Sequence, residues 1–258
     1  MSIRCDNCGR EYDVTLFQFG RTVRCDCGNV VTLSGVHTLR QQKAPTRMIL
    51  IRHAETDWNK EGRIQGHMPT HLNEQGRREA RLLAPRIADE RPQNLYSSDL
   101  PRALETAQPI AEATGLEIVS SEKLREAFFG LWEGKTFKEV QSGFPGEFAQ
   151  WAESDFHKAP PGGESAAELR ERIIAFLADV AEKHANQTTV IVTHGGPCKY
   201  AVAHVLGISP TGVYRYAIDN SSFTTIEIGV AGWRLVTLND TCHLRRGKDD
   251  GMMGKEKA

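Results

Sequence analysis

The chain from Arg47 onward alternates between short apolar runs and longer stretches that carry one apolar face. Continuously apolar runs of about four residues are typical of strands that are covered on both faces of a sheet. Such runs, and others rich in strand-forming residues, predict these strands: MILI (48–51), NLYSS (94–98), LEIV (116–119), TVIV (189–192), SFTTIEI (222–228) and WRLVTL (233–238).

Helical patterns occupy the stretches between the predicted strands. Asn73 is a suitable cap for a helix whose apolar residues recur every three or four positions. A second helix is expected over 99–113. Ser165 and Glu168 form a capping-box pattern ahead of a long amphipathic helix. A further helix is expected over 195–207, because glycines and a proline open it and a glycine ends it.

Strands that alternate with helices predict an α/β fold, here a three-layer α/β/α arrangement around a mostly parallel central sheet. In such folds ligands bind beyond the carboxyl ends of the strands. Arg52 and His53 follow the first strand, Ser98 ends the second, and His194 follows the TVIV strand. We therefore expect two imidazoles and a guanidinium to meet at one edge of the sheet.

The first 36 residues differ from the rest of the chain. Short alternating stretches and several glycines predict a few short strands and tight turns, too small to hold a core alone. We expect a small β-rich, zinc-ribbon-like segment over 1–36, a polar linker over 37–46 and the α/β domain over 47–244. The charged end, 245–258, is expected to be a polar, disordered tail.

Composition narrows the classes of function. The 258 residues are 40% hydrophobic and 25% charged, which suits a soluble globular protein. Lys and Arg total 32 against 33 for Asp and Glu, so the overall charge does not favour a nucleic-acid binder. No apolar run approaches the roughly 20 residues that span a bilayer, and the N-terminus has no signal-like apolar stretch. We expect a cytoplasmic protein that does not bind membranes.

Four of the six cysteines lie near the N-terminus, at Cys5, Cys8, Cys25 and Cys27. In a reducing compartment such a cluster favours a metal site over disulfides. Cys5-x-x-Cys8 followed by glycine is typical of a zinc knuckle, whereas Cys25-x-Cys27 is one residue shorter than usual. We expect a structural four-cysteine zinc. An unmetallated or degenerate ribbon is the alternative, and His37 is a substitute ligand. The sequence leaves any partner of the ribbon open.

The residues at the predicted sheet edge favour an anionic ligand. His53 and His194 could act as metal ligands, nucleophiles or charge donors. Arg52 disfavours a bound cation, because its guanidinium stays charged and its geometry matches phosphate oxygens. Gly195 and Gly196 at a helix start would add free N–H groups and the positive end of the helix dipole. Together these residues favour a phosphoryl group.

Ordered sequence blocks extend this constellation over the whole α/β region. The blocks are IRHAETDWN (51–59), RIQG (63–66), LNEQG (72–76), YSSDLPRA (96–103), LRE (124–126), WEG (132–134), PGGES (161–165) and VTHGG (192–196). With these motifs in this order, residues 47–244 resemble the histidine phosphatase superfamily, the phosphoglycerate-mutase-like proteins.

The resemblance implies a role for each matching residue. His53 corresponds to the nucleophile that becomes a phosphohistidine, and Glu126 to the proton donor for the leaving group and later the base for water. Arg52, Arg102 and His194 correspond to the clamp on the phosphoryl oxygens. The implied substrate-binding positions are Arg52, Thr56, Asn59, Gln65, Gly66, Arg102, His194 and Gly195. The implied reaction is hydrolysis of a small phosphorylated metabolite, a phosphate monoester, with no catalytic metal or other cofactor.

Departures from the family pattern concern the substrate more than the chemistry. Ala54 stands where the family usually has glycine, and Pro69 follows the Gln-Gly pair where aspartate is common. His67 and His71, in the same loop, are candidates for substrate contacts. The family pattern alone selects Glu126 as the acid over the other candidate carboxylates, Glu122, Glu133 and Glu164.

Two other functions fit the same residues. A phosphoglycerate mutase would return the phosphoryl group to product, which requires loops that keep water away. The compact region and the sequence Ile-Gln-Gly after Arg63 favour hydrolysis over mutase activity. An inert phosphatase-like domain in a binding or regulatory protein is the second alternative, and the presence of all five core catalytic positions argues against it.

Overall fold

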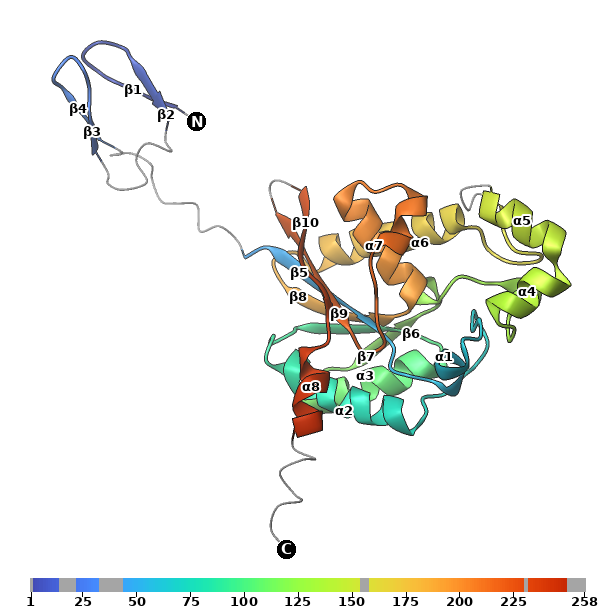
Figure 1. Cartoon of the computed structure of the whole chain (residues 1–258). Coiled ribbons are helices and arrows are strands. Elements are labelled where there is room, and N and C mark those ends of the chain that lie inside the picture. Colours follow the sequence, from blue (N-terminus) through green and yellow to red (C-terminus); the bar gives the residue numbers. More distant parts are fainter. Residues whose placement is uncertain (1, 14–21, 33–43, 154–157, 230–231, 250–258) are drawn as a thin grey trace, which may run out of the picture. The chain divides into compact units, whose positions relative to one another are not determined.

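The computed structural model describes residues 2–13, 22–32, 44–153, 158–229 and 232–249. The chain divides into two compact units, Met1–Lys43 and Ala44–Ala258 (Figure 1). The second unit begins its first strand at Thr46, inside the range expected to be a linker. No described helix combines the length and the apolar character that crossing a membrane requires.

The N-terminal unit contains two short antiparallel hairpins. Strands β1 (Ser2–Arg4) and β2 (Glu11–Asp13) form one, and β3 (Thr22–Arg24) and β4 (Val30–Thr32) form the other. The only fully buried apolar residues described in this unit are two cysteines and Val31. So small an apolar cluster gives little hydrophobic stabilisation, and units of this size usually need a further constraint such as a metal.

The larger unit is built on a six-stranded sheet with the order β10-β9-β5-β8-β6-β7. The strands are β5 (Thr46–Arg52), β6 (Asn94–Ser98), β7 (Ile118–Ser121), β8 (Thr188–Thr193), β9 (Phe223–Gly229) and β10 (Gly232–Asp240). Strands β5, β8, β6 and β7 run parallel to one another, whereas β9 and β10 are antiparallel. The expected mostly parallel sheet is confirmed.

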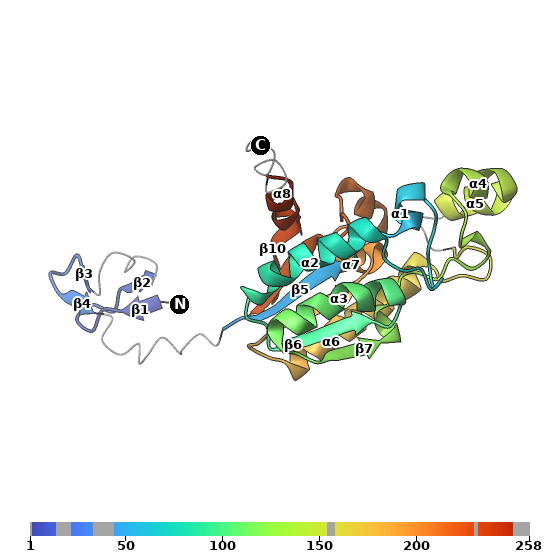
Figure 2. The ribbon, with the colours of Figure 1, turned by 90° about the horizontal axis from the view of Figure 1, so that it is seen from below.

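Helices cover both faces of this sheet, as Figures 1 and 2 show. The helices are α1 (Asp57–Glu61), α2 (Glu74–Ala88), α3 (Pro101–Thr114), α4 (Phe137–Gly143), α5 (Pro145–Glu153), α6 (Ala166–Lys183), α7 (Gly195–Leu206) and α8 (Cys242–Asp249). Single 3₁₀ turns occur at Glu122–Leu124 and Gly130–Trp132, and a longer 3₁₀ segment at Pro210–Arg215.

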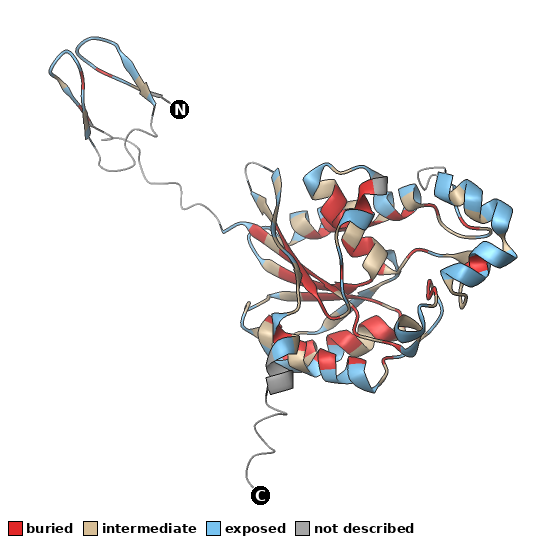
Figure 3. Cartoon of the chain, viewed as in Figure 1, coloured by how far each residue is buried: buried red, intermediate tan, exposed pale blue. Residues whose placement is uncertain are grey.

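Alternate residues of β5 face the two helical layers. Ile49 and Ile51 pack in a buried cluster with residues of α2 and α3. Met48 and Leu50 pack in a second cluster with residues of α6 and α7. All four side chains are buried, as the red strands at the centre of Figure 3 show. The continuous apolar run in the sequence therefore reflects burial on both faces.

The predicted helix caps are present. The Asn73 side chain accepts a hydrogen bond from the Gly76 amide at 2.8 Å, at the start of α2. Ser165 and Glu168 form a reciprocal capping box at the start of α6. Gly207 ends α7 with a left-handed φ of 62°, a conformation that glycine adopts without steric cost.

Two boundaries differ from the sequence-based expectation. The third strand covers 118–121, two residues later than the LEIV run. The expectation of a disordered tail from 245 is wrong for residues 245–249, because α8 continues to Asp249. His243 at the start of α8 is buried, and its ring lies 6.2 Å from that of Phe223. Burial of this aromatic contact stabilises a helix that its charged composition does not predict. Residues 250–258 lie outside the described residues.

Candidate active site

The parallel strands deliver the predicted residues to one edge of the sheet. Arg52 at the end of β5 is in register with Thr193 at the end of β8, and β6 runs parallel to β8 beside it. A cavity of about 480 Å³ opens at this edge. The predicted residues that line it are Arg52, His53, Asn59, Gln65, Gly66, Arg102, Glu126 and Gly195. Thr56 and His194 are buried and are not among the residues that line the cavity.

His53 is a buried imidazole held in one orientation. Its Nδ1 lies 2.8 Å from the carbonyl oxygen of Ala54. A carbonyl only accepts hydrogen bonds, so Nδ1 carries the proton and Nε2 keeps a lone pair. Burial lowers the pKa of His53 well below its ordinary value, and the charges of Arg102 and Arg52 lower it further. The ring is therefore neutral near pH 7 and available as a nucleophile.

His194 lies beside His53 and is fully buried. The two ring centroids are 5.1 Å apart, and His194 Nε2 lies 2.8 Å from the Ser98 hydroxyl oxygen. Its Nδ1 has no hydrogen-bond partner within the described part of the chain. Burial and the nearby cation of Arg102 hold the pKa of His194 well below its ordinary value. One nitrogen of a neutral ring is thus left for a ligand.

Arg102 is a fully buried guanidinium that forms no ion pair with a carboxylate in the described part of the chain. It donates hydrogen bonds to the carbonyl oxygens of Met68 and Gly66 at 2.9 and 2.7 Å, and to the Thr70 hydroxyl at 3.2 Å. Burial lowers the pKa of Arg102 to about 10. Buried charges are usually paired, so a buried cation whose described hydrogen-bond acceptors are all neutral oxygens is suited to an anionic ligand.

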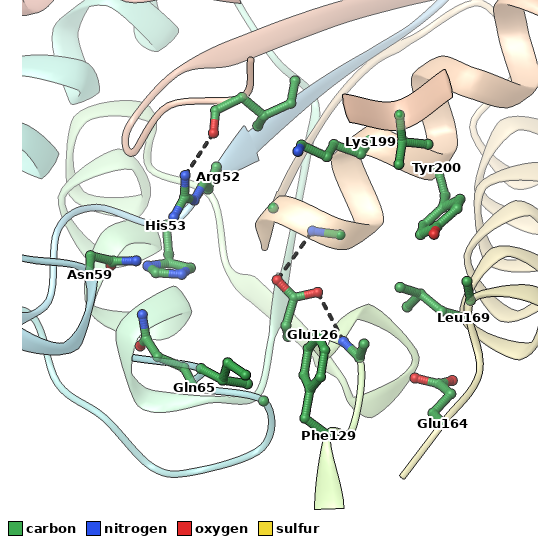
Figure 4. A pocket seen from close by; sticks show the side chains of 18 of the residues that line it. Arg52, His53, Asn59, Gln65, Glu126, Phe129, Glu164, Leu169, Lys199 and Tyr200 are labelled. Carbon is green, nitrogen blue, oxygen red and sulfur yellow. Dashed lines mark hydrogen bonds between the residues drawn. The ribbon is translucent and has the colours of Figure 1, made fainter. Parts of the chain in front are cut away.

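Arg52 provides a second cation at the cavity wall. Its guanidinium donates to the Ile218 carbonyl at 2.7 Å, whereas its Nε has no partner within the described residues (Figure 4). Burial lowers the pKa of Arg52, and the carboxylate of Glu126 opposes that shift. Two arginines with unused N–H donors therefore converge near His53, and planar guanidinium donors match phosphate oxygens.

Glu126 projects into the same cavity. Its two carboxylate oxygens accept hydrogen bonds from the amides of Ala127 at 2.9 Å and Gly196 at 3.1 Å (Figure 4). A Cβ at position 196 would lie only 2.2 Å from the Glu126 carboxylate, so the approach requires glycine. Glu126 thus lines the cavity beside the first residues of α7, where its charge acts on both arginines.

The other candidate acids are placed differently. The side chain of Glu122 is 77% exposed and does not line the cavity. Glu133 also lies outside the lining and accepts hydrogen bonds from the amides of His67 and Phe129. Glu164 lines the cavity, but Arg172 donates two hydrogen bonds to its carboxylate. Of the four candidate acids, Glu126 is therefore the one that lines the cavity and has no arginine pair among the described residues.

Two side-chain amides turn their N–H groups toward the ligand space. The Asn59 oxygen accepts hydrogen bonds from the Thr56 amide and from Asn220. The Gln65 oxygen accepts one from the Thr70 hydroxyl at 2.6 Å. Because their oxygens are occupied, Asn59 and Gln65 present donors to the cavity that they line. Thr56 acts indirectly, through the capping box that holds Asn59 at the start of α1.

The two histidines of the 64–72 loop lie outside the cavity lining. His67 Nε2 lies 2.9 Å from the carbonyl oxygen of Glu126, so it supports the backbone of the acid. His71 forms a hydrogen bond with Glu105 on α3. Sequence reasoning missed other lining residues, among them Lys199 and Asp219. Helical spacing could have found Lys199, because it lies four residues after Gly195 and thus on the same helix face.

Comparison with known proteins decides the family. The family model described as "Histidine phosphatase superfamily (branch 1)" matches residues 48–241. The chain belongs to this superfamily. Phosphoserine phosphatase 1 of Hydrogenobacter thermophilus is 36% identical over 198 residues, which is 77% of this chain and 94% of the relative. The metal-independent phosphoserine phosphatase of Arabidopsis thaliana is 33% identical over 202 residues, covering 77% and 83%.

A solved structure also matches most of this chain. It is a mutant phosphoserine phosphatase from Entamoeba histolytica in complex with phosphoserine, with a TM-score of 0.71 and 32% identity. The match covers 77% of this chain and 99% of that one. Like the matched family model, it leaves about a quarter of this chain uncovered.

The cysteine cluster precedes the histidine phosphatase region, which begins at 48. Its four sulfur atoms lie within 4.8 Å of one another, with Cys8 and Cys25 at 3.4 Å and Cys5 and Cys27 at 3.7 Å. Tetrahedral zinc with Zn–S bonds of about 2.3 Å would separate its sulfurs by about 3.8 Å. All four cysteines are free thiols, so the arrangement could hold a metal ion.

Proposed function

We propose that this protein hydrolyses small phosphate monoesters through a phosphohistidine on His53, without a catalytic metal. The observation that carries the proposal is the neutral, buried His53 ring, whose Nε2 keeps its lone pair. This ring lies in a cavity lined by two arginines that form no ion pair with a carboxylate among the described residues. The arginines can bind and neutralise a phosphoryl group, which is the electrostatic task that a metal ion performs elsewhere.

The reaction proceeds in two steps. In the first, His53 Nε2 attacks phosphorus, the bond from phosphorus to the ester oxygen breaks, and protonated Glu126 gives its proton to the departing alkoxide. In the second, the Glu126 carboxylate takes a proton from water. The resulting hydroxide attacks phosphorus, the P–N bond breaks, and inorganic phosphate leaves. His53 and protonated Glu126 are restored.

His194 supports charge on the phosphoryl oxygens. The Ser98 hydroxyl oxygen accepts a hydrogen bond from the Leu100 amide, which leaves its proton to donate to His194 Nε2. Nδ1 then carries the ring proton and donates to the phosphoryl group. Arg52, Arg102 and the Gly195 amide at the start of α7 complete the set of donors.

Phosphoserine is the substrate we favour. Two relatives at about one-third identity are phosphoserine phosphatases, and one structural neighbour holds phosphoserine. The match covers nearly the whole length of the Hydrogenobacter protein and of the structural neighbour, so the comparison includes their complete catalytic regions. We favour hydrolysis over mutase activity because these relatives are phosphatases.

Glu126→Gln tests the proposed acid, because the loss of activity in this variant should depend on whether the leaving group needs a proton. We expect kcat/KM for phosphoserine to fall about 10²–10⁴-fold, because an alkoxide needs a proton in order to leave. The loss for p-nitrophenyl phosphate should be at least tenfold smaller, since nitrophenolate leaves without one. The measurement is kcat/KM, which reports the steps up to loss of the leaving group. The control is Glu122→Gln, an exposed carboxylate outside the cavity. Equal losses on both substrates would contradict a role as acid.

We also propose that the four-cysteine cluster binds one structural zinc ion, and that this ion has no part in the chemistry. Gly9 and Gly28 follow the knuckles with left-handed φ angles of 73° and 88°. Their amides donate to the carbonyl oxygens of Cys5 and Cys25 at 2.8 Å. These tight turns place the two sulfur atoms of each knuckle on the same side of the backbone. Four thiolate ligands fill the tetrahedral coordination of zinc and leave no open position for substrate.

Zinc removal should loosen the N-terminal unit and leave the phosphatase activity of the larger unit almost unchanged. We expect one zinc per chain by elemental analysis, and its loss in Cys25→Ser. Chelation should increase hydrogen exchange in the two hairpins while phosphate release changes less than twofold, because the metal supplies folding free energy only to the N-terminal unit. If chelation stopped phosphate release while the 44–249 region stayed folded, the metal-free mechanism would be wrong.

A further inference from the structure

Lys199 is a cation in the cavity wall that the proposed chemistry does not use. It lies on α7 one turn beyond Gly195, lines the cavity and is half-buried. Figure 4 shows its side chain extending from α7 toward the side of the cavity that holds Arg52. The phosphoryl site already has two arginines, two histidines and the Gly195 amide. A further cation therefore has another task.

The ammonium group of Lys199 has no counterion among the described residues. Its Nζ lies 5.0 Å from the centre of the Tyr214 ring, an aromatic contact that orients the side chain without neutralising it. The other carboxylates of the cavity wall are occupied, Glu164 by Arg172 and Asp219 by Asn239. Burial and the charge of Arg52 lower the pKa of Lys199, and Glu126 opposes the shift.

The position of Lys199 suits a group near the phosphate but separate from it. One helical turn advances about 5.4 Å along the axis from the amides of Gly195 and Gly196. The backbone of Lys199 thus starts about one turn from these amides, and its ammonium lies close enough for the charge of Arg52 to act on it. The apolar residues Val213 and Ile218 also line the cavity, so the lysine's aliphatic part can pack there while its point charge meets an anion.

We infer that Lys199 binds a carboxylate of the substrate and selects phosphate monoesters of small acids over neutral ones. This inference rests on the proposed phosphatase activity. The ammonium pairs with the carboxylate when the phosphoryl group is seated on the arginines. The pairing fixes the ester oxygen relative to Glu126 and favours substrates that carry both anionic groups.

The test compares substrates that differ in one carboxylate. Phosphoserine is paired with phosphoethanolamine, and 3-phosphoglycerate with glycerol 3-phosphate. The readout is the ratio of kcat/KM for the acidic to the neutral member of each pair, in wild type, Lys199→Met, Lys199→Arg and the exposed control Lys138→Met. We expect Lys199→Met to lower the ratio at least tenfold for the preferred pair, consistent with loss of a charge-assisted hydrogen bond. Lys199→Arg should retain most of the ratio, and Lys138→Met all of it.

The outcomes separate this inference from the proposed function. An unchanged ratio in Lys199→Met would overturn the inference, and so would a wild type that does not prefer the acidic member of either pair. An equal loss on both members would show that Lys199 acts on the phosphoryl group instead. If folded wild type released no phosphate from these compounds or from p-nitrophenyl phosphate, the proposed phosphatase function itself would fail.

Discussion

Replacing His53 with alanine is expected to lower kcat at least about 1,000-fold, because the group that forms the covalent intermediate is lost. The remaining arginines would still bind phosphate esters, so substrate affinity should change far less than turnover. Among the described residues, the imidazole forms one hydrogen bond, with the Ala54 carbonyl oxygen, and its ring packs against His194. The fold should therefore persist.

The measurement is phosphate release from phosphoserine and p-nitrophenyl phosphate, with chelator present, alongside thermal unfolding of both proteins. Lys138→Met serves as the exposed control. Activity within tenfold of wild type in a folded His53→Ala protein would exclude His53 as the nucleophile. Loss of folding would leave activity uninterpretable in that variant, so His53→Gln, which preserves polarity and approximate size, provides a second test of the same claim.

Arg102→Ala is expected to cause the second largest loss, about 10²–10³-fold in kcat, because a preorganised donor to the transition state disappears. It should also destabilise the protein by about 1–3 kcal/mol, since the buried carbonyl oxygens of Gly66 and Met68 would lose their donor. Arg102→Lys keeps a charge but not the planar fork of donors, so we expect an intermediate loss.

Steady-state kinetics and urea unfolding check the Arg102 prediction. Arg78→Ala, an exposed arginine on α2, is the matched control. A change in KM alone, with kcat preserved, would show that Arg102 binds substrate and transition state equally and would contradict its proposed role in catalysis. An unchanged unfolding free energy would contradict the importance of its contacts with the carbonyl oxygens.

Much of the fold follows from local patterns in the sequence. The apolar runs at 48–51 and 189–192 predict buried strands because those side chains are buried on both faces. Helix caps such as Asn73 depend on a few neighbouring residues and are equally predictable. The antiparallel direction of β9 and β10 could not be predicted in this way. Strand pairing depends on contacts between distant segments, which no local pattern specifies.

Some residues of the candidate site could likewise be predicted from the sequence, and others could not. His53 and His194 could be predicted to meet, since both directly follow parallel strands. The choice of Glu126 over Glu164 could not be made from the residues alone, because it depends on the distant partner Arg172. Lys199 was missed although its helical spacing places it with the glycines at the start of α7.

The most direct test of the central claim is to trap the phosphorylated enzyme. Wild type and His53→Ala would be mixed with phosphoserine in chelator, quenched in alkali, which preserves phosphohistidine, and analysed by peptide mass spectrometry. The mechanism predicts one phosphoryl group on the peptide that contains His53, labile in acid and absent from the variant. A wild type that turns over substrate without this label, or that carries it on another residue, would contradict the mechanism.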